Sequence, residues 1–242
     1  MSALYDSIGI NYAELRKPDP RIAQRIEQAL GAARAILNVG AGTGSYEPMG
    51  RELVAVEPSR EMIRKRSPSA ARAIQATADN LPFGDGRFDA SMAILTLHHW
   101  PDKAAGLREM RRVTRGPILL LTFDPSHRPW LTDYLPQLAM LDEAQMPKMS
   151  DYARWLGQVR ISPLLVPYDC TDGFLYAYWR RPAAYLDARI RSGSSSFWKI
   201  GDAEAGLSRL ARDLETGEWQ RRYAELLALE EYDAGYRLVI SP

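Results

Sequence analysis

The sequence predicts an α/β fold in which a mostly parallel sheet of seven strands carries a helical cap. Over the first 124 residues, short apolar runs alternate with segments of helical periodicity, as in consecutive βαβ units. After Asp124 this alternation stops, and residues 125–233 are mainly helical in pattern before a last apolar run. Because a parallel sheet is buried on both faces, we expect helices on both sides of the core.

Five apolar runs predict the first five strands, at residues 35–39, 53–56, 73–76, 88–95 and 118–123. Helices are expected between and before them, at 21–34, 59–66 and 103–113. The first helix carries Ile22, Ile26 and Leu30 at helical spacing. Ser59 is a favourable N-cap for the second helix, which Pro68 ends. The last two strands are expected at 161–168 and 236–240.

The break in pattern divides the chain into three expected parts. Residues 1–124 form a core that begins with a helical lid, and residues 234–242 supply the final core strand. Residues 125–233 form the cap, apart from the strand at 161–168, which belongs to the core sheet. The cap is therefore inserted after strand 5 and again between strands 6 and 7.

The composition indicates a globular protein without a strongly charged partner. Lys and Arg total 31 against 30 Asp and Glu, a net charge of +1, which argues against nucleic-acid binding. Cys170 is the single cysteine, so no intrachain disulfide forms and the reducing cytoplasm is expected. No apolar run is long enough to cross a bilayer, and the first 20 residues lack a signal-peptide core. No membrane partner is expected.

A glycine-rich turn follows the first predicted strand. Its glycines, Gly40, Gly42 and Gly44, permit positive φ and a close approach of ligand to backbone. Glu57 ends the second strand, where a carboxylate accepts hydrogen bonds from ribose hydroxyls. This Rossmann-like arrangement predicts a nucleotide-type cofactor. A nicotinamide-dependent oxidoreductase is one interpretation, although the third glycine stands one position earlier than in the dinucleotide fingerprint.

Two further motifs extend the pattern. Asp79-Asn80-Leu81-Pro82-Phe83 follows the third strand, and Leu97-His98-His99-Trp100-Pro101-Asp102 follows the fourth. With the glycine turn and Glu57, they resemble the class I S-adenosylmethionine-dependent methyltransferases, of the methyltransferase 11 type that acts on small molecules. The resemblance covers about residues 1–124.

The resemblance implies S-adenosylmethionine as the cofactor and assigns roles to residues. The three glycines form the family's first motif, and Glu57 holds the ribose. Asp79 takes the adenine amino group, while the backbone of Asn80 meets the ring. Leu95, at the end of the fourth strand, is also expected in the cofactor site. Asn38 stands where many members have an aspartate, a position that steadies the turn; taken alone, Asp79 is equally a turn residue.

The amino-terminal segment offers a partner for the cofactor's carboxylate. Tyr12 and Arg16 are four residues apart and share one helix face. A guanidinium suits a carboxylate, and in relatives such a helix folds over the methionine end. The alternative is an amphipathic helix whose tyrosines pack and whose arginine stays solvated.

Two adjacent histidines are candidates for a base. His98 and His99 follow the fourth strand, and Asp124 ends the fifth at the same edge, where it could orient an imidazole. A hydroxyl acceptor needs such a base, with a pKa near 6.5 if unperturbed. At most one of the two is expected to face the acceptor, and in some relatives both only shape the loop. No metal is expected, because Ile94 to Leu97 offers no carboxylate.

The cap is rich in aromatic residues, which suit a ring-shaped or lipophilic acceptor. The residues expected to bind substrate, because they flank loop mouths, are Trp130, Tyr134, Tyr178 and Arg181. Most cap aromatics have the simpler explanation that a small helical cap needs a core. Its amphipathic helices could equally form a homodimer face.

The sequence therefore predicts methyl transfer from S-adenosylmethionine to oxygen or nitrogen of a small organic acceptor, a specialised metabolite. Three alternatives stay open at this stage. One is cyclisation or elimination by an enzyme that binds the same cofactor. The others are the nicotinamide-dependent oxidoreductase and a non-catalytic binding protein that keeps the fold.

Overall fold

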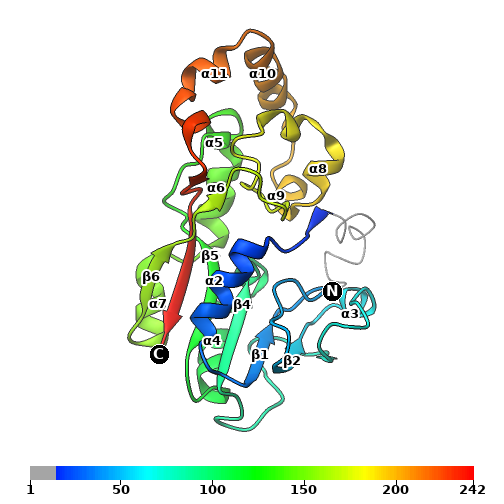
Figure 1. The fold of residues 1–242 in the computed structure, drawn as a ribbon, viewed down its shortest axis with the longest axis vertical. Helices are drawn as coiled ribbons and strands as arrows, with labels where there is room; N and C mark the ends of the chain where they lie inside the picture. The colour runs from blue at the N-terminus through cyan, green and yellow to red at the C-terminus, as the bar shows by residue number, and fades with distance from the viewer. Residues whose placement is uncertain (1–14) are drawn as a thin grey trace.

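The computed structural model describes residues 15–242, and its core is a seven-stranded sheet (Figure 1). The strands are β1 Ala35–Val39, β2 Glu52–Val56, β3 Ala73–Ile74, β4 Ala90–Ile94, β5 Ile118–Phe123, β6 Arg160–Pro163 and β9 Tyr236–Ser241. Their order is β3-β2-β1-β4-β5-β9-β6, with β9 antiparallel to both neighbours and the strands from β3 to β5 paired in parallel. This confirms the predicted mostly parallel sheet. The order reverses between β1 and β4, where open α/β sheets bind ligands.

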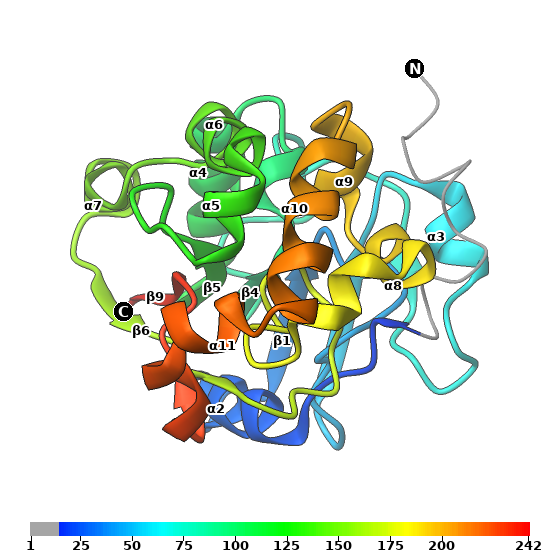
Figure 2. The same cartoon turned by 90° about the horizontal axis from the view of Figure 1, so that it is seen from above.

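Helices surround the sheet and build the cap. The core helices are α2 Pro20–Leu30, α3 Arg60–Arg64, α4 Lys103–Val113 and α7 Met149–Leu156. The cap contains α5 Leu131–Tyr134, α6 Pro136–Gln145, α8 Ala188–Ser192, α9 Ser195–Lys199, α10 Glu204–Glu215 and α11 Glu218–Arg222. Figure 1 shows the cap stacked beyond one end of the sheet, and Figure 2 shows it from above. Within residues 15–242, no helix has the length and apolar character to span a membrane.

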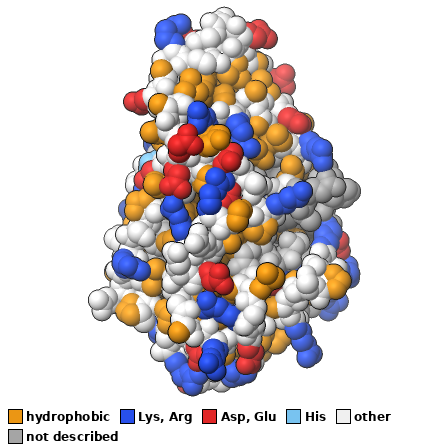
Figure 3. All heavy atoms as spheres, viewed as in Figure 1, with side chains coloured by type: hydrophobic (Ala, Val, Ile, Leu, Met, Phe, Trp, Pro, Cys, Tyr) orange, Lys and Arg blue, Asp and Glu red, His pale blue; other side chains and the backbone are white. Residues whose placement is uncertain are grey.

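The two faces of the sheet bury alternate side chains of the same strand. In β1, Ile36 packs in one apolar cluster with Ile22 and Ile26 of α2. Leu37, the next residue, packs in a second cluster with Leu107 of α4. This alternation follows from the two-residue period of a strand, and burial of both faces explains why the parallel strands are mainly apolar. The surface is mixed in charge: acidic and basic side chains are interspersed over the face in Figure 3.

Several predicted elements are longer than the observed ones, and for two of them the physical cause is clear. The helix predicted to residue 34 ends at Leu30, because Gly31 takes a φ of 56°. The strand predicted at 161–168 is divided: β6 stops at Pro163, and Val166–Pro167 (β7) pairs with Glu231–Tyr232 (β8) in a separate two-stranded sheet. Proline has no N–H to donate to a ladder, which accounts for the division.

Asp19 connects the start of α2 to the cap. Its buried carboxylate accepts hydrogen bonds from the backbone N–H of Arg21 at 3.0 Å and of Thr171 at 3.1 Å. The Arg21 guanidinium lies 2.7 Å away. Burial alone raises the pKa of Asp19, but these hydrogen bonds outweigh it and lower the pKa to about 2. The charged carboxylate therefore stabilises the junction between the start of α2 and the segment at Thr171.

We expect Asp19→Asn to lower the free energy of unfolding by about 2 kcal/mol at pH 7, because asparagine still serves as the N-cap of α2 but lacks the charge. A depressed pKa stabilises the fold above the ordinary value of 3.8, and this contribution disappears as the pH falls toward 2. Urea titrations at pH 7 and pH 3 should show a smaller difference at the lower pH. Asp169→Asn is the control, since Asp169 also pairs with Arg21 but is 52% exposed. An equal loss in both variants would contradict this account.

Candidate active site

Glycine is needed for different reasons at the three glycine positions of the turn after β1. All have positive φ: 69° at Gly40, 51° at Gly42 and 100° at Gly44. A Cβ at Gly40 would lie 2.2 Å from Oγ1 of Thr96, and one at Gly44 would press on three side chains. A Cβ at Gly42 would meet nothing closer than Met62 Cε at 4.0 Å. Gly40 and Gly44 thus allow the chain to pack, while Gly42 borders open space.

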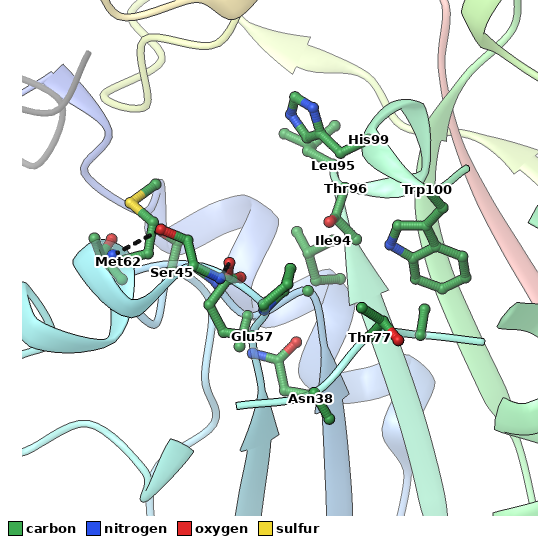
Figure 4. A pocket seen from close by; sticks show the side chains of 18 of the residues that line it. Asn38, Ser45, Glu57, Met62, Thr77, Ile94, Leu95, Thr96, His99 and Trp100 are labelled. Atoms are coloured by element: carbon green, nitrogen blue, oxygen red, sulfur yellow. Dashed lines mark hydrogen bonds between the residues drawn. The ribbon is translucent and has the colours of Figure 1, made fainter. Parts of the chain in front are cut away.

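That open space is a cavity of about 260 Å³ at the point where the sheet order reverses. Figure 4 shows the side chains of Glu57, Thr96 and His99 around it, the first at the end of β2 and the others just after β4. The predicted site residues that line it are Arg16, Gly40, Gly42, Glu57, Asp79, Leu95 and His99. Gly44 and Asn80 do not line it. The separate motifs of the sequence therefore meet in one place.

Glu57 lines this cavity, and two backbone hydrogen bonds fix its carboxylate. Its Oε2 accepts the N–H of Gly42 at 2.8 Å, and its Oε1 accepts the N–H of Ser59 at 2.9 Å. Burial, to 7% exposure, raises the pKa of the carboxyl, while the two backbone hydrogen bonds and the charge of Arg66 oppose that shift. A carboxylate has about four acceptor positions, so two remain for hydroxyl groups of a ligand.

A buried ion pair that the motifs did not indicate holds the other side of the turn. Arg66 donates to the carbonyl of Gly42 at 2.9 Å and to Oε1 of Glu47 at 2.5 Å. Their side chains are only 5% and 8% exposed. Asn38 donates to the same Glu47 oxygen at 3.1 Å, which gives this residue the steadying role expected of its position. Gly42 is thus fixed through its N–H by one acid and through its carbonyl by an arginine.

Arg16 lines the cavity and is held by a residue of the cap. Its Nε donates to Asp172 at 2.6 Å, and Tyr46 donates to the other oxygen of the same carboxylate at 2.9 Å. The Arg16 side chain is 12% exposed, so the solvated alternative does not describe it. Tyr12 lies outside the described residues, and its contact with the cofactor stays a prediction.

A second cavity, of about 80 Å³, adjoins the first beneath the cap. The two share three lining residues, Arg16, Leu95 and Thr96. The other walls of the second cavity come from β5, α6 and the cap segments 174–176 and 194–196. Leu95, at the shared wall, has the left-handed φ of 51° that few side chains adopt, and such strain is often found at functional sites.

His98 and His99 face different cavities, although their ring centroids are only 3.8 Å apart. His98 lines the second cavity and His99 the first. Burial is the main cause that lowers both pKa values, that of His98 well below 6.5 and that of His99 to about 3. The positive charges of Lys199 and Arg16 act in the same direction. Both imidazoles are therefore neutral at physiological pH.

Other candidates from the sequence lie elsewhere. Asp124 accepts hydrogen bonds from Ser126 and lies 3.5 Å from Arg237. It lines neither cavity, so its role in orienting an imidazole stays untested. Among residues 15–242, no three His, Cys, Asp or Glu side chains are grouped to hold a metal ion.

The four cap residues expected to bind substrate also line neither cavity. Trp130 donates to the carbonyl of Trp179 at 2.8 Å and is 4% exposed. Tyr134 donates to a carboxylate on α10 at 2.8 Å. Arg181 stacks over Tyr178 and donates to two backbone carbonyls. In this structure these residues stabilise the interior of the cap, as the simpler explanation of its aromatics anticipates.

Comparison with known proteins identifies the class. Residues 37–117 match the family model for a methyltransferase domain. The structure superposes with a TM-score of 0.85 on a protein of Anabaena variabilis that is named "putative methyltransferase from antibiotic biosynthesis pathway". The sequences are 35% identical, over 94% of this chain and 99% of that one. The chain is also 28% identical to the uncharacterized methyltransferase YcgJ of Bacillus subtilis, over 68% of this chain and 67% of that protein.

Another relative, demethylmenaquinone methyltransferase of Corynebacterium urealyticum, is 34% identical over 51% of this chain and 59% of that enzyme. The chain belongs to the class I S-adenosylmethionine-dependent methyltransferases, and it is an enzyme that uses S-adenosylmethionine. The cavity fits this cofactor: Gly42 leaves the space that a side chain would fill, and Glu57 offers free acceptor positions suited to a ribose.

Gly42→Val should abolish binding of S-adenosylmethionine, because the side chain enters the cavity from a position where nothing else obstructs it. Titration calorimetry measures the affinity. Gly31→Val is the matched control: Gly31 has a similar φ of 56° and no neighbour within 4 Å, so it carries the same backbone cost of about 1–2 kcal/mol. Retained binding in Gly42→Val, or an equal loss of binding in the control, would show that the glycine turn does not bind S-adenosylmethionine.

Glu57→Ala should weaken the affinity for S-adenosylmethionine by about 1.5–3 kcal/mol, since it removes charged hydrogen bonds to the ribose. Glu52→Ala, at the exposed start of the same strand, should leave the affinity unchanged. Unaltered affinity in Glu57→Ala would show that the ribose lies elsewhere.

Proposed function

We propose that the protein transfers the methyl group of S-adenosylmethionine to oxygen or nitrogen of a small organic acceptor, a specialised metabolite. The observation that carries this proposal is the pair of adjoining cavities, which share Arg16, Leu95 and Thr96 beside the end of β4. One cavity has the cofactor motifs and the other lies beneath the cap. A donor and an acceptor bound in them would meet at the shared wall.

The relationship with the Anabaena protein supports the metabolite class, because that protein is named for an antibiotic biosynthesis pathway and matches 94% of this chain. The cap that closes the second cavity is part of the match. Cys170, the single cysteine, is buried and free, which suits a reaction in the reducing cytoplasm.

Alignment of the acceptor atom with the methyl group accounts for much of the rate enhancement in such a reaction. S-adenosylmethionine brings an already activated methyl group, so the chain's task is to hold the acceptor atom in line, about 3–3.5 Å away. Leu95 and Thr96 line both cavities, and this alignment would occur beside them. For a hydroxyl acceptor, His98 is the better placed base, because it lines the second cavity and is neutral at physiological pH.

The test is an acceptor screen read by mass spectrometry, after calorimetry has established cofactor binding. With a hydroxyl acceptor, His98→Ala should lower turnover by about 10²–10⁴ and leave cofactor affinity intact. His127→Ala is the control, since His127 lines neither cavity. Because burial lowers the pKa of His98, the acid limb of the turnover profile should lie well below pH 6.5. A loss of less than about tenfold in His98→Ala would remove it as the base.

A further inference from the structure

Asp142 places a carboxylate in the wall of the second cavity. It stands on α6, and its Oδ2 accepts a hydrogen bond from the hydroxyl of Tyr176 at 2.7 Å. Both residues line the cavity, in which Asp142 is the one acidic side chain among the described lining residues. No cation of residues 15–242 lies within ion-pair distance of it. Within the described part of the chain, the neutral hydroxyl of Tyr176 is therefore the one direct partner of this carboxylate at the cavity wall.

The cations in the neighbourhood are engaged elsewhere. Arg128 pairs with Glu143 and donates to the carbonyl of Pro125. Arg16, in the same cavity wall, is paired with Asp172, and Lys199 donates to the side chain of Gln145 at 3.0 Å. A partly buried carboxylate without a cationic partner is costly, and in a cavity such a group commonly serves a ligand.

Aromatic rings form the wall next to this carboxylate. Phe123 and Tyr176 have ring centroids 5.1 Å apart, Phe123 and Tyr236 are 5.4 Å apart, and Phe174 and Tyr236 are 4.6 Å apart. All four rings line the second cavity. Aromatic faces attract cations, so they favour the same kind of ligand as the carboxylate.

We propose that the second cavity binds a positively charged amino group of the acceptor, with Asp142 as its counter-ion and the four rings around it. A neutral hydroxyl would leave the charge of Asp142 unpaired, and an anion would be repelled by it. A cavity of about 80 Å³ accommodates an amino group and the few atoms next to it. This assignment rests on the proposed function, which makes this cavity the acceptor site.

The buried carboxylate of Asp142 lowers the stability of the fold when it is ionised. Burial raises the pKa of Asp142 to about 6, against the opposing effects of the Tyr176 hydroxyl and the charge of Arg128. The folded state therefore favours the protonated acid, so stability falls as the pH rises from 3.8 to about 6, and the full penalty is present above that. His98 and Arg16 also line the cavity; His98 is neutral in this range and Arg16 keeps its charge, so Asp142 is the group whose charge changes there.

The experiment compares amines with neutral alcohols of the same shape. Three pairs are titrated at pH 7.5 in the presence of saturating S-adenosylhomocysteine: propylamine and propanol, benzylamine and benzyl alcohol, and 2-phenylethylamine and 2-phenylethanol. We expect at least one amine to bind with a dissociation constant about tenfold or more below that of its alcohol. Asp142→Asn should remove this preference, while Glu143→Gln, an exposed carboxylate on the same helix, should keep it.

The proposal is overturned if no amine binds better than its alcohol, or if the preference survives in Asp142→Asn. Failure of S-adenosylhomocysteine to bind the wild-type protein would instead overturn the proposed function. Thermal unfolding of Asp142→Asn is the second readout: its Tm should exceed that of the wild type at pH 8, and the gain should shrink at pH 5. A Tm lowered at pH 8 would identify Asp142 as a structural group and would also overturn the proposal.

Discussion

The fixed position of Gly42 is the constraint on which the rest of the active site depends. Its N–H is bound by Glu57 and its carbonyl by Arg66, which is itself paired with Glu47. The residue has a φ of 51° and leaves space where a side chain would stand. Because the same carboxylate that binds the turn also lines the cavity, the turn and the free acceptor positions of Glu57 are fixed relative to one another.

The reversal of strand order between β1 and β4 places this turn beside the end of β4. That end carries Leu95, whose left-handed φ turns the chain toward the two histidines. The cap, inserted after β5 and held to the start of α2 through Asp19, then closes a second cavity over the same edge. The carboxyl ends of the strands thus carry two adjacent cavities, one bordered by the glycine turn and the other by the cap.

The sequence brought together the residues of the first cavity far better than those of the second, for a physical reason. The glycine turn and the acid after β2 are short contiguous motifs that depend on local backbone geometry, so Gly42 and Glu57 could be expected at one cavity. Arg66 and Glu47 are ordinary charges 19 residues apart, and nothing local distinguishes a buried pair from a solvated one. Asp142 meets Tyr176 only when the cap folds. Aromatic composition likewise does not tell whether a residue lines a cavity or packs inside the cap. Trp130, which was expected to bind substrate, is buried in the interior of the cap.

The most direct test of the account is the position of the donor methyl group in a crystal structure of the protein with S-adenosylmethionine. The ribose hydroxyls should lie within hydrogen-bond distance of Glu57, and the methyl group should point past Leu95 into the cavity lined by His98 and Asp142. A ribose bound away from Glu57, or a methyl group directed away from that second cavity, would contradict it.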